Sequence, residues 1–218
     1  MKTLQIDIVS DIACPWCAIG YARLEQAMQA LEAEFTFLVE WHAFELNPDS
    51  ASEGEPILQA LSRKYGRSAE EMEAAQSNMM AIATELGLNF SQMQERYTCN
   101  TFDAHRLVKW AGEQGCQTAM KMALFEAYFG RADNVSDEKV LVACAEAIGL
   151  QGNEAREILA SDAYAQEVRA DEARYQQSGV SAVPAFIINQ RHLISGAQEP
   201  DTLINAFREI ATRSATPE

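Results

Sequence analysis

The stretch Ser10–Cys17, SDIACPWC, joins a segment with a strand pattern to a segment with a helix pattern. Residues 4–8 alternate apolar and polar side chains, which is the period of a half-buried strand. Residues 15–34 place apolar side chains near one helical face, and Pro15 suits a first helical turn, where its missing N–H is no loss. The two cysteines, with Pro15 and Trp16 between them, therefore stand where a strand passes into a helix.

Outward from this junction, the sequence predicts a mixed α/β fold. Residues 35–44, FTFLVEWHAF, are rich in aromatic and β-branched residues and predict a second strand, which a right-handed crossover would set parallel to the first. Near the C-terminus, residues 185–189 and 192–196 have the spacing of a hairpin, and an amphipathic helix is expected from Pro200. The predicted strands therefore come from both ends of the chain.

Between these ends, residues 56–179 carry only helical patterns. Ser68 and Glu71 form a capping-box pattern before a helix that is expected to end near Gly87. Further helices are predicted at 102–114, 117–129, 136–148, 153–160 and 162–177. We therefore expect one α/β domain, formed by residues 1–52 and 160–218, which is interrupted by an all-helical insertion domain of residues 53–159.

The composition disfavours several classes of protein. Lys and Arg total 17 against 32 Asp and Glu, and the net charge of −15 disfavours binding to nucleic acid. No run approaches the roughly 20 apolar residues that cross a bilayer, and the N-terminus lacks the apolar core of a signal peptide. We expect a cytoplasmic protein, for which five cysteines, an odd number, are a poor disulfide framework.

The spacing of Cys14 and Cys17 favours redox chemistry. Cys14 precedes a helix start, where unpaired N–H groups and the helix dipole favour a thiolate, the reactive form of cysteine. Cys17 lies one turn further on and close enough to bridge to it. We predict that Cys14 is the exposed nucleophile and Cys17 the shielded resolving thiol, while Pro15 and Trp16 tune the pair. Such a redox-active disulfide requires no bound cofactor or metal.

Two alternatives for the CPWC segment have weaker support. A structural zinc site needs four ligands, normally as two close pairs, and the remaining cysteines and the three histidines are scattered along the chain. Two inert buried cysteines are the other alternative.

No cationic residue lies between Ser10 and Ala22, so a distant cation would have to come near on folding to stabilise a thiolate at Cys14. His42 is the candidate for that role, with simple packing as the alternative.

Other chemically interesting residues have structural interpretations as well. Cys116 and Cys144 fall on apolar helical stripes and are predicted to be core residues. Cys99 lies in a polar link and is the best candidate for an accessory thiol, although burial is favoured for it too. Asn100 and His105 could line a cleft that faces the CPWC segment, and helix capping is the alternative for Asn100.

Family resemblance sharpens these expectations. Residues 179–198, GVSAVPAFIINQRHLISGAQ, resemble the cis-proline segment of the thioredoxin superfamily. The resemblance implies that Val183 and Pro184 face the CxxC and that the backbone of Val183 pairs with a substrate strand. From the residues alone, Pro184 could equally be a trans proline at the start of a strand.

A thioredoxin fold split after its second strand by helices resembles the DsbA family. Residues 42–49, HAFELNPD, 100–107, NTFDAHRL, and 195–198, SGAQ, are similar to segments of its cytosolic FrnE-like branch. The resemblance implies a thiol:disulfide oxidoreductase or isomerase that acts on protein or small thiol substrates, with glutathione as a further candidate partner. A homodimer through the helical block is compatible with the sequence, but no residue pattern demands one.

One neighbouring family shares this layout and supplies the alternative function. Kappa-class glutathione transferases and 2-hydroxychromene-2-carboxylate isomerases resemble the chain, but they typically carry serine at the position of Cys14 and lack the second cysteine. Retention of Cys14 and Cys17 therefore favours disulfide exchange over glutathione-dependent conjugation or isomerisation. A redox-inactive binding protein, with an unreactive Cys14, is a further alternative.

Overall fold

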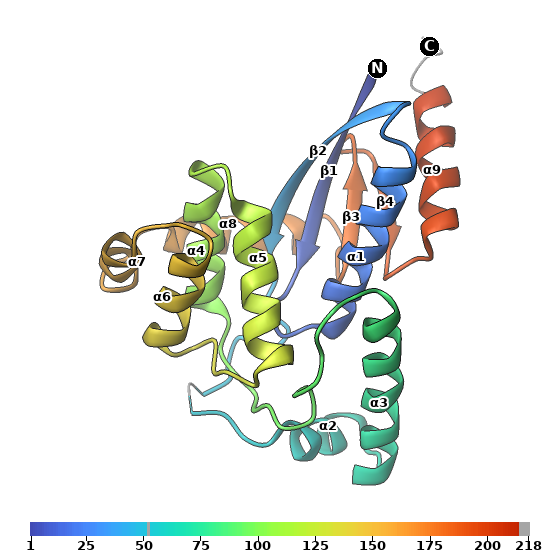
Figure 1. Cartoon of the computed structure of the whole chain (residues 1–218). Helices are drawn as coiled ribbons and strands as arrows, with labels where there is room; N and C mark the ends of the chain where they lie inside the picture. Colours follow the sequence, from blue (N-terminus) through green and yellow to red (C-terminus); the bar gives the residue numbers. More distant parts are fainter. Residues whose placement is uncertain (52, 214–218) are drawn as a thin grey trace.

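The computed structural model describes residues 1–51 and 53–213 (Figure 1). The strands are β1 (Lys2–Ser10), β2 (Phe35–Ala43), β3 (Ala185–Ile188) and β4 (His192–Ser195). The helices are α1 (Pro15–Ala30), α2 (Ile57–Tyr65), α3 (Ala69–Glu85), α4 (Phe102–Glu113), α5 (Gln117–Phe125), α6 (Glu138–Ala147), α7 (Gly152–Leu159), α8 (Ala165–Gln177) and α9 (Pro200–Arg213), and a π-helical turn, η1 (Glu126–Gly130), extends α5. The predicted domain limits at residues 52 and 218 fall on residues outside the described ranges.

The four strands form one sheet in the order β2-β1-β3-β4. β1 pairs in parallel with β2, with Ile6 opposite Val39, and it pairs in antiparallel fashion with β3, with Ile6 opposite Ile188. β3 and β4 form the predicted hairpin, whose turn uses Asn189 and Gln190 at positive φ. Two residues at positive φ match the twist of a tight hairpin. The α/β fold class and the contribution of both chain ends to one sheet are confirmed.

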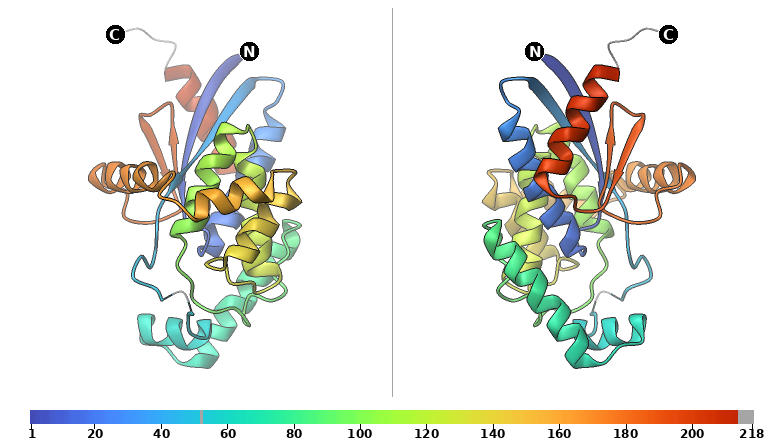
Figure 2. Two further views of the ribbon diagram at one scale, coloured as in Figure 1. Left: turned by 90° about the vertical axis from the view of Figure 1, so that its left-hand side faces the viewer. Right: turned by 90° about the vertical axis from the view of Figure 1, so that its right-hand side faces the viewer.

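The sheet has helices on both faces (Figures 1 and 2). α1 and α9 cover one face, where Ile6 and Ile8 of β1 are fully buried with Leu24 of α1 and Phe207 of α9. α8 covers the other face, where Val9 packs with Tyr175. The alternation follows from the period of two along a strand, which sends Ile8 and Val9 to opposite faces.

The helical residues between β2 and β3 meet the sheet at the edge strand β2. The side-chain amide of Gln117 in α5 accepts a hydrogen bond from Trp41 N (2.9 Å) and donates one to Trp41 O (3.0 Å), as a neighbouring strand would. The indole N–H of Trp41 donates to Thr118 Oγ1 (2.9 Å). α2 and α3 lie apart from α4–α7, below the first turn of α1 (Figure 1). Within the described ranges, no helix has the length and hydropathy to span a membrane.

Several helix boundaries differ from the predicted ones. α1 ends at Ala30, not near residue 34, because the chain must turn before it enters β2 at Phe35. α8 begins at Ala165 because Tyr164 takes a left-handed conformation, with φ of 61°. The helix predicted over 117–129 stops at residue 125 and continues as the π-helical turn η1.

α2 was not predicted from the sequence. It has only nine residues, and a short segment between Pro56 and Gly66 gives too few turns for a clear periodic signal. Its last residue is followed by Gly66 at φ of 64°, the conformation that favours glycine at a helix end. The omission matters because α2 forms a wall of the candidate site.

Candidate active site

The CPWC segment forms the N-terminus of α1. Cys14 is the N-cap residue and makes no side-chain capping bond, and Pro15 opens the first turn. The Cys14 carbonyl accepts a hydrogen bond from Cys17 N (3.0 Å), which brings the two residues onto one turn. Cys14 Sγ lies 3.7 Å from Val183 O, and the Val183–Pro184 peptide bond is cis. The structure therefore brings together the two motifs that the sequence singled out, although they are separated by most of the chain.

Gly20 lets the Pro184 loop lie directly on α1. A Cβ atom at position 20 would lie 3.0 Å from Pro184 Cγ and 3.3 Å from Ala197 Cβ, both tighter than ordinary contacts. The absence of a side chain at Gly20 thus sets the distance between the helix that carries Cys14 and the loop that carries Val183.

We expect Gly20→Ala to destabilise the protein by about 1–3 kcal/mol, because an added methyl overpacks this contact. Urea unfolding measures the change. Gly112→Ala is the matched control, since its Cβ would meet only Gln117 at 3.4 Å or more and alanine favours a helix interior by about 0.5–1 kcal/mol. An equal change in the free energy of unfolding in the two variants would contradict the proposed role of the contact at Gly20.

The prediction that Cys14 is exposed is wrong. Cys14 is 5% exposed and Cys17 1%, while Trp16 between them is 39% exposed. The Val183 carbonyl lies against the sulfur of Cys14, and the small exposed part of Cys14 borders a cavity. The sulfur of Cys14 is therefore accessible mainly from the cavity.

Cys17 lies in surroundings that keep its thiol protonated. Burial, followed by the hydrogen bond and charge of Cys14, raises the pKa of Cys17 well above its usual value. The positive charge of Lys121 acts in the opposite direction. Such a thiol reacts slowly, because little of it is in the reactive thiolate form.

One cation near the cysteines is Lys121 of α5, which sequence reasoning missed. Its side chain is completely buried, with Nζ 3.4 Å from Ser10 O and 5.4 Å from the ring centroid of Trp41. Burial lowers its pKa to about 8, whereas the charges of Cys17, Asp11 and Cys14 act to raise it. The available signal was a lysine in the otherwise largely apolar segment 117–125.

His42, the cation candidate from the sequence, lies on the sheet face that α8 covers. Its Nε2 is 3.3 Å from Asp7 Oδ1 and its Nδ1 is 3.2 Å from Asp171 Oδ2. Asp7, Glu40 and His42 offer ligand atoms within 4.8 Å of one another, but both ring nitrogens of His42 already have carboxylate neighbours. The structure does not bring His42 to the cysteines, because it alternates with Trp41 along β2 and Trp41 takes the α1 face.

His105 does not line the cavity beside Cys14 but lies buried against Asp11. Both are buried, and His105 Nε2 lies 3.5 Å from Asp11 Oδ1 without hydrogen-bond alignment. Burial and then the charge of Lys121 lower the pKa of His105. Burial acts to raise the pKa of Asp11, but His105 and the backbone N–H of Leu46 outweigh it and hold the pKa below its usual value. Asp11 and Lys121 thus form a buried charged layer beneath the cysteines.

Asn100 has a structural role just before the N-cap of α4, which is Thr101 and has no side-chain capping bond. Its Oδ1 accepts a hydrogen bond from Phe102 N at the start of α4 (3.0 Å), and its Nδ2 donates to Pro48 O (2.9 Å). These bonds tie the segment after β2 to the helical residues. Asn100 does not line the cavity beside Cys14.

The remaining cysteines are buried or half-buried. Cys99 lines the same cavity as Cys14, and burial, reinforced by the charge of Asp11, raises its pKa to about 12. Burial raises the pKa of Cys144 to about 11. Cys116 is half-buried at the N-cap of α5. The high pKa values make Cys99 and Cys144 poor nucleophiles.

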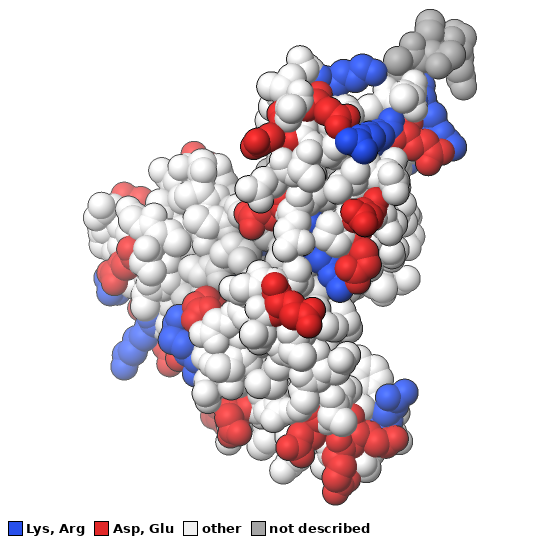
Figure 3. All heavy atoms as spheres, turned by 45° about the vertical axis from the view of Figure 1, so that its right-hand side comes forward, with Lys and Arg blue, Asp and Glu red and all other residues white. Residues whose placement is uncertain are grey.

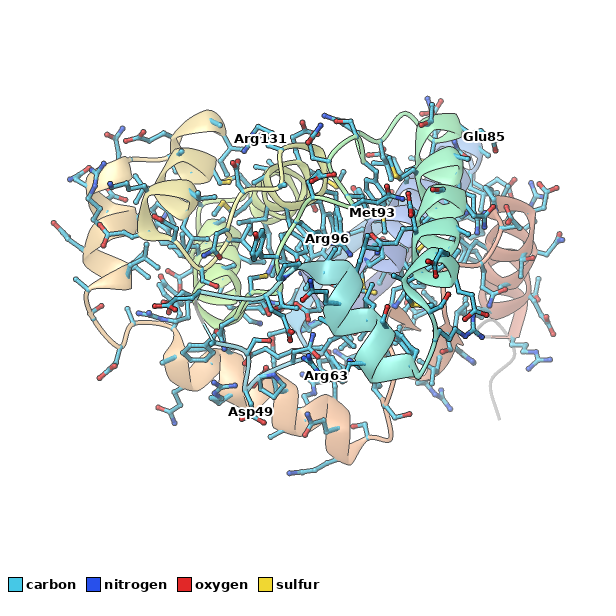
Figure 4. The ribbon with its side chains drawn as sticks, turned by 90° about the horizontal axis from the view of Figure 1, so that it is seen from below. Asp49, Arg63, Glu85, Met93, Arg96 and Arg131 are labelled. Carbon is cyan, nitrogen blue, oxygen red and sulfur yellow. The ribbon has the colours of Figure 1, made fainter. Side chains whose placement is uncertain are left out.

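A cavity of about 630 Å³ opens between the first turn of α1 and the α2–α3 pair. Cys14, Pro15 and Trp16 line it on one side, and α2 and α3 contribute apolar side chains on the other. These include Ile57, Leu61, Met72 and Met79. Figure 4 looks into this end of the molecule, with Arg96 and Met93 behind α2. The volume lies in the range of small-molecule sites.

A four-stranded α/β sheet, helices between β2 and β3, and a CxxC that faces a cis-proline loop define a thioredoxin-fold protein. The DSBA-like thioredoxin domain family matches residues 5–208. The chain therefore belongs to the DSBA-like thioredoxin domain family, as the resemblance predicted.

Solved structures agree with this assignment. A probable DsbA oxidoreductase from Streptomyces coelicolor is 37% identical, with a TM-score of 0.92 over 99% of this chain and 92% of that one. A 2-hydroxychromene-2-carboxylate isomerase is 14% identical, with a TM-score of 0.74 over 97% and 98% of the two chains. The cytosolic disulfide reductase DsbM from Pseudomonas aeruginosa, solved with GSH, is 17% identical, with a TM-score of 0.64 over 96% and 99%. The last two similarities show the fold alone.

Proposed function

We propose that the protein is a thiol:disulfide oxidoreductase whose reactive groups are Cys14 and Cys17. The observation that carries this proposal is the position of Cys14 at the start of α1, with its sulfur 3.7 Å from the carbonyl of Val183 and with Cys17 behind it. A nucleophilic thiol, a shielded second thiol and an adjacent strand-pairing backbone are the parts that disulfide exchange requires.

The reaction proceeds in two balanced steps. The Cys14 thiolate attacks one sulfur of a substrate disulfide, which forms a mixed disulfide and releases one substrate thiolate. Cys17 then gives up its proton and attacks the sulfur of Cys14, which closes the Cys14–Cys17 disulfide and releases the second thiolate. Two electrons pass from the protein to the substrate, and the reverse sequence oxidises a substrate dithiol. No bound cofactor or metal takes part in these steps.

The Val183–Pro184 loop is proposed to hold a protein substrate. Val183 is half-buried and its carbonyl faces Cys14, so a strand that pairs with its backbone would bring a cysteine to the site. Pro15 and Trp16 border the same opening. Protein and small thiols are both proposed substrates. We further propose a cytoplasmic location, the FrnE-like branch of the family, and the two-domain division with residues 53–159 as the insertion.

A second candidate function is glutathione-dependent transfer or isomerisation of a small molecule. The enclosed cavity beside Cys14 favours it, because a site of this size accommodates a small molecule as readily as a peptide. The fold is also similar to that of 2-hydroxychromene-2-carboxylate isomerase, and the structure of DsbM contains GSH.

One comparison of activities separates the two functions. Purified protein is assayed for reduction of a fluorescence-quenched peptide disulfide in a glutathione buffer, and separately for conjugation of glutathione to an aromatic electrophile. The proposal expects turnover of the peptide disulfide well above the rate of the buffer alone and no conjugation. Conjugation without disulfide turnover would favour the second candidate instead.

A further inference from the structure

The cavity beside Cys14 contains a buried arginine that lacks a carboxylate partner. Arg96 is 3% exposed, and its Nη1 donates to Gln76 Oε1 (2.9 Å) and to the carbonyl of Met93. Its guanidinium lies 5.3 and 5.1 Å from the ring centroids of Tyr128 and Phe129. Among residues 1–51 and 53–213, Arg96 forms no ion pair, and burial lowers its pKa. A buried charge of this kind is costly unless something neutralises it.

Two N–H donors at this position also lack partners. They are Nε of Arg96 and Nε2 of Gln76, both buried in the described part of the chain, and both residues line the cavity that Cys14 lines. An unpaired buried donor costs the full desolvation of the group. The donors of Arg96 and Gln76 are therefore suited to an acceptor that enters from the cavity.

A second buried arginine in the same chain, Arg106, provides a comparison for the hydrogen bonding of Arg96. Arg106 is 4% exposed, and all three of its nitrogens have acceptors. Its Nε donates to Ala163 O (2.8 Å), its Nη1 to Asp103 Oδ1 (2.7 Å), and its Nη2 to the carbonyls of Ile158 and Ser161. Arg96 thus differs from Arg106 in having an unpaired Nε and no carboxylate neighbour among the residues that the structure describes, and it lines the cavity.

The charges around the cavity contrast with those of the outer surface. Arg63, Lys64 and Arg67 of α2 and the turn after it line the cavity along with Arg96, and Glu55, the carboxylate among the described lining residues, pairs with Arg63. In Figure 4, Arg96 lies in the interior beside Met93, and Arg63 lies nearer the edge, toward Asp49. The outer face of the same end of the molecule is rich in acidic side chains (Figure 3), and the whole chain carries a net charge of −15. A cationic lining in an acidic protein favours an anionic ligand.

We infer that this cavity binds a small thiol or disulfide that carries a carboxylate, with the carboxylate held by Arg96 and Gln76 and the sulfur placed at Cys14. The inference rests on the proposed disulfide chemistry and adds a substrate class to it. The Cys14 thiolate attacks the bound disulfide and forms a mixed disulfide as one carboxylate-bearing thiolate leaves. Attack by Cys17 then releases the second. Arg96 binds the substrate and takes no part in bond breaking.

Two aromatic disulfides of similar size test this inference. Dithiobis-nitrobenzoate carries a carboxylate on each ring, and dithiodipyridine carries none. The rate at which each oxidises the fully reduced protein is measured by stopped-flow absorbance for the native protein, Arg96→Met, Gln76→Leu and Arg131→Met. Arg131 is the matched control, because it is exposed, pairs with Asp133 and does not line the cavity.

Arg96→Met is expected to slow the reaction with dithiobis-nitrobenzoate about tenfold or more, the order expected for loss of a charge-assisted bond, and to leave the reaction with dithiodipyridine unchanged. Arg131→Met is expected to change neither. An equal effect of Arg96→Met on both disulfides, or none, would overturn the inference. If Arg96→Met does not fold, Gln76→Leu takes its place. It is expected to slow the reaction with dithiobis-nitrobenzoate and leave the reaction with dithiodipyridine unchanged, and an equal effect on both would overturn the inference. If dithiodipyridine fails to oxidise Cys14 and Cys17 of the native protein, the proposed function itself falls.

Discussion

Cys17→Ser is expected to stop after the first half of disulfide exchange and to accumulate as a mixed disulfide at Cys14. Cys17 is 1% exposed behind Cys14, on the same turn of α1. Cys99 lines the same cavity, but burial raises its pKa to about 12, so it is a poor substitute for Cys17 in releasing the substrate. Incubation with oxidised glutathione should therefore add one glutathione per molecule, which intact-protein mass spectrometry reads directly. Turnover should fall about 100-fold or more, since resolution is then left to external thiol.

Two further variants make this experiment specific. Cys14→Ser should form no adduct and show no turnover, because the thiol that first attacks is gone. Cys116→Ser should behave as the native protein, since Cys116 is at the N-cap of α5, a position where serine is favoured. Full turnover by Cys17→Ser would show that the second thiol is not used and would favour glutathione-dependent transfer.

Lys121→Met is expected to lower the reduction potential of the Cys14–Cys17 pair by about 30 mV or more, equivalent to about 1.4 kcal/mol for two electrons. The buried ammonium attracts a thiolate at Cys14 in the reduced protein, and the neutral disulfide lacks that attraction. Its removal therefore favours the oxidised form. Equilibration in graded glutathione buffers, followed by alkylation and mass measurement, gives the potential.

The control for this second prediction is another lysine of the helical residues. Lys109 pairs with Asp171 on the α8 side of the sheet, so Lys109→Met should leave the potential unchanged. An unchanged potential in Lys121→Met would mean that the buried charge does not act on the cysteines. A rise in the potential would contradict the sign of the proposed interaction.

Local signals in the sequence predicted the parts of the site that depend on local structure. The strand-to-helix junction at CPWC, the parallel strand after α1 and the C-terminal hairpin were recognised, because alternation, helix starts and turn residues act over a few positions. The family resemblance added the Val183–Pro184 loop, which lies against Cys14.

The rest depended on contacts between distant residues. Lys121 of α5 and Arg96 of the loop between α3 and α4 come to the cysteines from about 100 and 80 residues away in sequence, and nothing in their neighbours indicates which side of the fold they reach. Burial of Cys14 depends on the same tertiary contacts. His42 was the candidate cation from the sequence, but its place on β2 directs it to the opposite face of the sheet.

The reduction potential of the Cys14–Cys17 pair tests the central claim most directly. The protein is equilibrated in buffers of graded glutathione ratio, quenched with acid, alkylated and read by mass. The account predicts a single two-electron transition in which Cys14 and Cys17 lose their alkylation together, while Cys99, Cys116 and Cys144 stay alkylated throughout. Absence of a Cys14–Cys17 disulfide at every ratio would contradict the account.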